Sequence, residues 1–146
     1  MGGIMGFVEA IRSAFKNSRK MTGRATRSEY WFFYLFFLMG LLPVAIAGGF
    51  LANAMNEASP IHYNPLAGKV FLAMVVVYTA IMFFPLLGVS IRRLHDIGHS
   101  AWFLLLYLIP LGGPIMLVVF TLPGTKGPNK FGEDPSGNAS GFAKVF

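Results

Sequence analysis

Three long apolar runs that contain no charged residue dominate the hydrophobic pattern of this chain. They comprise residues 31–52, 70–91 and 101–122. A helix of about 22 residues is roughly 33 Å long, which is enough to cross a hydrocarbon core of roughly 30 Å. A helix also satisfies its own backbone polar groups, which lipid cannot do. The pattern therefore predicts an all-α integral membrane protein, a helical bundle with three hydrophobic segments.

The segment before the first run has a different pattern, with apolar residues at helical spacing. Residues 4–19 predict an amphipathic helix. Its apolar face carries Ile4, Phe7, Val8, Ile11 and Phe15, and its polar face carries Arg12, Lys16 and Arg19. Such a helix suits the membrane interface, and the alternative is that it packs on the cytoplasmic side of the protein itself. The chain thus divides into an N-terminal segment (1–22), a transmembrane helical domain (23–122) and a turn-rich tail (123–146).

Local signals mark the ends of the predicted helices. Thr26 and Glu29 have the spacing of a capping box at the start of the first span. Gly98 is a plausible residue to end the second span. Asp96 would be unfavourable at that C-terminus, so we expect it to have a cationic partner. Arg92 lies four residues earlier on the same helix face, and Arg24 or Arg27 would reach Asp96 if the two cytoplasmic helix ends pack together.

The third apolar run is interrupted at its middle by Pro and Gly residues at positions 109–114. It is either a kinked span or a re-entrant hairpin whose arms are too short to cross. Six Lys and Arg residues precede the first run, one lies in the first loop, two lie in the second loop and three lie in the tail. This bias predicts a cytoplasmic N-terminus. Three spans would put eight cations inside and four outside, whereas a hairpin would give eleven and one.

Composition narrows the class of protein. Only 12% of the 146 residues are charged, against about 25% in a soluble domain. In a soluble protein, the net charge of +6 would suggest nucleic-acid binding. Beside apolar spans, positive charge instead determines the membrane topology and binds anionic lipid headgroups. The expected partners are therefore membrane lipids, mainly anionic, and a membrane protein or a second copy of the chain, with no nucleic acid.

Three segments together resemble a known family. They are residues 23–31 (GRATRSEYW), 92–102 (RRLHDIGHSAW) and 124–135 (GTKGPNKFGEDP), in this order around the apolar runs. The joint pattern is similar to the bacterial inner-membrane family called domain of unknown function 805, over roughly residues 20–135. The resemblance implies a small multi-pass protein of the bacterial inner membrane and implies no reaction.

The polar residues near the helix ends offer three readings. His95, Asp96 and His99 resemble metal ligands, but the helix is expected to end between the histidines, so we predict neither a metal nor a cofactor. His95 and Asp96 are weak candidates for acid–base catalysis, without a recognisable nucleophile beside them. The favoured reading is an interfacial charge cluster that binds lipid or a partner. Its members are Arg24, Arg27, Glu29, Arg92, Arg93, Asp96 and Lys126.

These residues lead to one main functional hypothesis and two alternatives. The main hypothesis is a non-enzymatic scaffold or adaptor whose basic cytoplasmic face binds a partner protein or anionic lipid. The first alternative is an oligomeric channel or small transporter, suggested by the Pro/Gly break, although no ionisable residue lies inside a run as transport usually requires. The second alternative is a membrane-embedded enzyme that acts on lipid headgroups.

Overall fold

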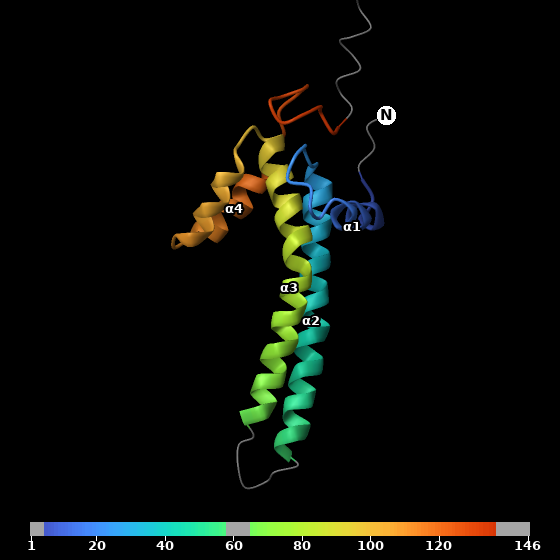
Figure 1. Cartoon of the computed structure of the whole chain (residues 1–146), viewed down its shortest axis with the longest axis vertical. Coiled ribbons are helices and arrows are strands. Elements are labelled where there is room, and N and C mark those ends of the chain that lie inside the picture. Colours follow the sequence, from blue (N-terminus) through green and yellow to red (C-terminus); the bar gives the residue numbers. More distant parts are fainter. Residues whose placement is uncertain (1–4, 58–64, 137–146) are drawn as a thin grey trace, which may run out of the picture. The chain divides into compact units, whose positions relative to one another are not determined.

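The computed structural model describes residues 5–57 and 65–136, and their regular secondary structure is helical apart from one isolated bridge. The elements are α1 (Phe7–Lys16), α2 (Arg27–Glu57), α3 (Pro65–Asp96), the 3₁₀ helix η1 (Ala101–Leu108) and α4 (Gly112–Thr121), as Figure 1 shows. The predicted all-α class is confirmed. The chain forms two compact units: the first unit is Met1–Tyr34 with Pro85–Phe146, and the second unit is Leu35–Phe84.

Helices α2 and α3 are the two elements of the described chain that are long and apolar enough to cross a membrane. With 31 and 32 residues, they are roughly 46 and 48 Å long. Both extend beyond the predicted runs 31–52 and 70–91, because a helix continues into polar flanks as long as its backbone hydrogen bonds continue. Apolar side chains are exposed along both helices. A helix that is apolar on all sides is typical of a membrane span.

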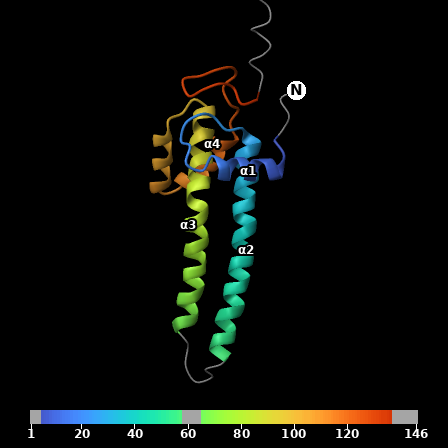
Figure 2. The same cartoon turned by 45° about the vertical axis from the view of Figure 1, so that its right-hand side comes forward.

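In the second unit, segments of α2 and α3 lie side by side, which Figures 1 and 2 show from two directions. The hydroxyl of Tyr78 donates a hydrogen bond of 2.7 Å to the carbonyl of Phe37, and the two rings stack. A side chain at Gly40 would collide with Tyr78, and one at Gly48 would collide with Phe71. The two helices therefore approach closely at Gly40 and Gly48.

In the first unit, α1 packs on the start of α2. Ala10 and Ala14 are fully buried, and Phe7 makes an edge-to-face contact with Phe32. Val8 is 65% exposed, so part of the predicted apolar face points away from the protein. The helix covers residues 7–16 of the predicted 4–19, of which residue 4 lies outside the described residues. One face packs on the protein, and the membrane-interface alternative stays a prediction.

The helix-end signals read from the sequence are found, with one correction. Gly98 has φ +81°, the amide of His99 donates to the carbonyl of Leu94, and the amide of Gly98 donates to the carbonyl of His95. These two bonds are the Schellman motif that ends a helix. At α2, the amide of Glu29 donates to the Thr26 hydroxyl at 3.1 Å, which confirms half of the capping box. The Glu29 carboxylate, however, turns away to other partners.

The third apolar run consists of two short helices instead of one long helix. The break predicted at 109–114 separates η1 from α4, and the amide of Gly112 donates to the carbonyl of Ile109 in the turn. Leu111 adopts φ +67°, and a side chain at Gly112 would collide with the carbonyl of Leu106. At roughly 2.0 and 1.5 Å per residue, the two helices are roughly 16 and 15 Å long. The run thus forms a helical hairpin, which we call the η1–α4 hairpin.

Candidate functional site

Asp96, the last residue of α3, is the centre of a buried ion-pair network. Its carboxylate accepts a hydrogen bond of 2.9 Å from Arg24 Nε and a second from Arg93 Nη1. The Arg24 and Arg93 side chains are 1% and 0% exposed. Because a buried cation is costly without a counter-charge, this one carboxylate allows both guanidinium groups to be buried.

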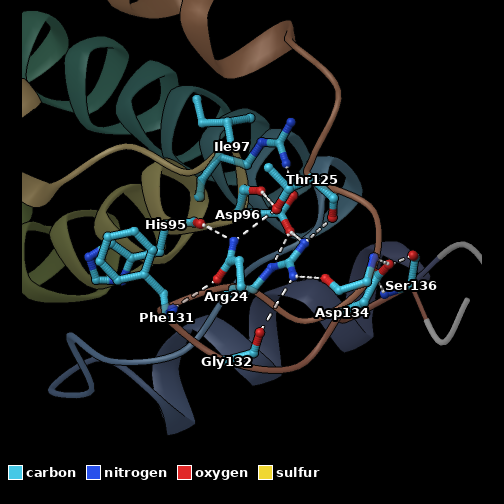
Figure 3. A network of polar contacts seen from close by, with 12 residues as sticks. Arg24, His95, Asp96, Ile97, Thr125, Phe131, Gly132, Asp134 and Ser136 are labelled. Atoms are coloured by element: carbon cyan, nitrogen blue, oxygen red, sulfur yellow. Dashed lines mark hydrogen bonds and ion pairs between the residues drawn. The ribbon is translucent and has the colours of Figure 1, made fainter. Parts of the chain in front are cut away.

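Arg24 also binds the tail after α4. Its Nη1 donates to the carbonyl of Gly127 at 2.6 Å, and its Nη2 donates to the carbonyl of Thr125. A longer contact of 3.5 Å joins Nη1 to the carbonyl of Gly132. Figure 3 shows the guanidinium group of Arg24 between Asp96 and the loop that carries these carbonyls. The planar fork of donors lets one side chain join the end of α3 to three positions of the tail.

Arg93 does the same for the end of α4. Its Nε donates to the carbonyl of Phe120 at 3.3 Å, and its Nη2 donates to the carbonyl of Leu122. Carbonyls in the last turn of a helix lack partners within the helix, so a buried cation there is favourable. Arg93 therefore fixes the returning arm of the η1–α4 hairpin on α3.

A second buried ion pair joins α2 to α3 and to α1. Arg92 Nη2 lies 3.0 Å from Glu29 Oε1, and the two side chains are 6% and 5% exposed. The Ser13 hydroxyl of α1 donates to the same carboxylate oxygen at 2.8 Å. This pair explains why Glu29 does not complete the capping box. The expected cationic partner of Asp96 is confirmed: of the three candidates it is Arg24, while Arg92 pairs with Glu29 instead.

His95 lies at the edge of this network. Its ring stacks on Phe131 with 4.0 Å between ring centroids, and its Nδ1 is 3.2 Å from the carbonyl of Gly23. His99 instead has its Nδ1 3.0 Å from the carbonyl of Ile97. The described residues contain no group of three or more His, Cys, Asp or Glu side chains that could hold a metal ion. The catalytic roles considered for His95 and Asp96 stay untested predictions.

The seven predicted site residues fall into two groups. Five of them, Arg24, Glu29, Arg92, Arg93 and Asp96, are buried and paired with one another. Arg27 and Lys126 are exposed. Arg27 Nε donates to the carbonyl of Leu122 at 3.1 Å, and among the described residues its terminal nitrogens have no hydrogen-bond partner. The buried group thus holds the fold, and the exposed pair is the part of the cluster available to another molecule.

Sequence reasoning missed the backbone and tail partners of the network. The Asn129 side-chain amide donates to the carbonyl of His95 at 3.0 Å, and the Thr125 amide donates to the carbonyl of Asp96 at 2.8 Å. Asp134 accepts hydrogen bonds from Ser136 and the amide of Gly127, which hold the pKa of its carboxyl below the usual range. The Gly-rich composition of the tail indicated turns, but it carried no signal of which carbonyls would face Arg24.

A cavity of about 300 Å³ opens between the start of α2, the end of α3 and the tail. Its lining includes four cationic residues and two carboxylates: Arg24, Arg27, Arg93, Lys126, Asp96 and Asp134. Because cations outnumber carboxylates by two, this cavity favours anions. We call it the tail pocket.

Comparison with known proteins gives the family context. The sequence profile of the family described as protein of unknown function (DUF805) matches residues 18–133. The chain belongs to this family. It is 36% identical to the inner membrane protein YhaH of Escherichia coli K12 over 121 residues, which are 82% of this chain and 90% of YhaH. It is 34% identical to the inner membrane protein YhaI of the same strain over 124 residues, 84% of this chain and 92% of YhaI. No solved structure matches the chain significantly.

Proposed function

We propose that this protein is a multi-pass protein of the bacterial inner membrane that acts as a non-enzymatic adaptor. Its N-terminus lies in the cytoplasm, and its basic cytoplasmic surface binds anionic lipid or a partner protein. The location is supported by the names of the two relatives, which are inner membrane proteins, and by the long apolar helices α2 and α3.

The η1–α4 hairpin supports a topology with two crossings. Neither arm reaches across a hydrocarbon core of roughly 30 Å. The chain before and after the hairpin is joined by the backbone hydrogen bond from Thr125 to Asp96, and Arg24 binds the same tail. The tail then lies on the side of the N-terminal segment, and eleven of the 12 Lys and Arg residues share that side. The positive-inside rule makes that side the cytoplasm.

Cysteine accessibility tests this topology directly, since the chain contains no cysteine. We expect single cysteines at Thr22 and Glu133 to react with a membrane-impermeant maleimide only after the inner membrane is opened. A cysteine at Lys69 should react in intact spheroplasts. All three positions are exposed in the structure. Labelling of position 133 together with position 69 would mean that the third run crosses the membrane, and would contradict the two-crossing topology.

One observation carries the adaptor proposal: the charges of the first unit are divided between a buried set that forms ion pairs and an exposed set that is mostly basic. The buried network contains three arginines and two carboxylates. Among the described residues of the first unit, the exposed cations are Arg12, Lys16, Arg19, Lys20, Arg27, Lys126 and Lys130. The buried groups are engaged in ion pairs and in bonds to backbone carbonyls, an arrangement that supports a fixed scaffold more than a reactive centre. The exposed cations are suited to anionic surfaces.

Native mass spectrometry of the protein in nanodiscs made from its own membrane tests the adaptor proposal. We expect the chain to carry another protein or a defined anionic lipid. A variant with Arg12, Lys16, Arg27 and Lys126 changed to Gln should lose most of that cargo, because its basic surface is weakened. The control is Lys69→Gln, which removes an exposed cation of the second unit. Solute flux through liposomes containing the protein, with no bound partner or lipid, would contradict the proposal and favour a channel.

A further inference from the structure

We propose that the tail pocket binds a phosphate group at the membrane surface. This inference rests on the proposed basic cytoplasmic surface and names the chemistry that one part of that surface recognises. Phosphate is common to a phospholipid headgroup and to free inorganic phosphate, and the experiment below separates these two sources.

The charge of the tail pocket is the first argument. Four cationic residues and two carboxylates line about 300 Å³, so the side chains of the pocket have a net formal charge of +2. One carboxylate, Asp96, is already shared between Arg24 and Arg93. The other, Asp134, accepts hydrogen bonds from Ser136 and Gly127. Both carboxylates are thus engaged, and a singly or doubly charged phosphate would balance the excess of cations.

The available donors are the second argument. Arg24 and Arg93 direct their donors to Asp96 and to backbone carbonyls, so they contribute charge more than new hydrogen bonds. Arg27 uses only Nε, for the carbonyl of Leu122, and its Nη1 and Nη2 have no partner among the described residues. Lys126 also lines the pocket, is exposed and likewise has no partner within the described chain. A guanidinium fork and an ammonium group that line the same pocket are both favourable donors for phosphate oxygens.

The position of the pocket is the third argument and favours phosphate over an acidic peptide. Arg27 is the first residue of the long apolar helix α2, and Leu122 directly follows α4. Helix α2 therefore begins at the wall of the pocket, and α4 ends shortly before Gly124, which also lines the pocket. Phospholipid phosphates lie at this boundary between the hydrocarbon core and water, so phosphate is the anionic group that the pocket meets at the highest local concentration.

The test is native mass spectrometry of the full chain in detergent, titrated with phosphatidylglycerol and, separately, with diacylglycerol, which lacks phosphate. The pocket variant is Arg27→Gln with Lys126→Gln. The matched control is Arg12→Gln with Lys16→Gln, which removes the same charge from the exposed side of α1. We expect the pocket variant to bind phosphatidylglycerol at least about tenfold more weakly than the control, because charge-assisted hydrogen bonds are lost. Diacylglycerol binding should not differ between the variants.

Inorganic phosphate added as a competitor distinguishes the source. Displacement of phosphatidylglycerol at millimolar phosphate indicates a site for free phosphate, and retention indicates a lipid headgroup site; both outcomes support the proposal. Equal weakening in both variants would overturn the pocket while leaving the adaptor on its basic surface intact. No weakening in either variant would overturn the pocket. The adaptor proposal would be overturned separately, by a missing cargo in native nanodiscs. Circular dichroism of each variant checks that the helices are retained.

Discussion

Replacing Asp96 with asparagine should lower the free energy of unfolding by about 3–5 kcal/mol, the range for a buried ion pair that loses one partner. The substitution keeps the shape of the side chain but removes the charge that neutralises Arg24 and Arg93. Two guanidinium groups would then be buried without a counter-ion. Urea unfolding in micelles measures the effect, with the fluorescence of Trp31 and Trp102 as a signal from the first unit.

The control for this prediction is Glu133→Gln, which also converts a carboxylate into an amide. Glu133 is exposed, so its replacement should change the free energy of unfolding by less than about 0.5 kcal/mol. A loss of similar size in both variants would mean that net charge, and not the buried network, determines the stability of the first unit. The contrast between the two variants is thus the informative quantity.

Replacing Arg24 with lysine should release the tail although the positive charge is kept. Arg24 contacts Asp96 and the carbonyls of Thr125, Gly127 and Gly132 through three different nitrogens. A single ammonium group cannot reach all of these acceptors. We expect a local loss of about 2–4 kcal/mol from the charge-assisted bonds that are broken. Amide hydrogen exchange should then accelerate by roughly thirtyfold or more in residues 123–136.

In the hydrogen-exchange measurement, the second unit serves as an internal reference and Arg27→Lys serves as the matched control for Arg24→Lys. Exchange in the second unit should not change, because the partners of Arg24 among the described residues all lie in the first unit. Arg27→Lys makes the same chemical change at an exposed residue with one backbone contact, and it should leave the tail protected. Unchanged exchange in the tail of Arg24→Lys would show that other contacts, such as the Thr125–Asp96 backbone bond, are sufficient to hold it.

The structure changes which variants test the charge cluster. From the sequence, Arg92 and Asp96 were natural positions at which to look for lipid or partner binding. Both are buried and paired, so their replacement would disturb the fold and binding together. Arg27 and Lys126 are exposed and line the tail pocket, and their replacement separates binding from stability.

The amino-acid sequence by itself determined the helical class, the positions of two long apolar helices and the residues of the charge cluster. These are local properties: apolar runs without charges, the Thr26 cap and the stop at Gly98 depend on residues close together in the chain. The family resemblance also followed from short segments in a fixed order, and the match over residues 18–133 confirms it.

Only the tertiary structure decided how the polar residues pair and which of them remain exposed. Asp96 could meet Arg92 or Arg93 with equal ease along one helix, and the choice depends on Glu29 arriving from α2. The binding of the tail depends on backbone carbonyls, which every residue has and which no sequence pattern distinguishes. The course of the third run likewise depends on Arg93, which binds the carbonyls of Phe120 and Leu122. These contacts join positions far apart in the chain, so their energies appear only when the helices pack.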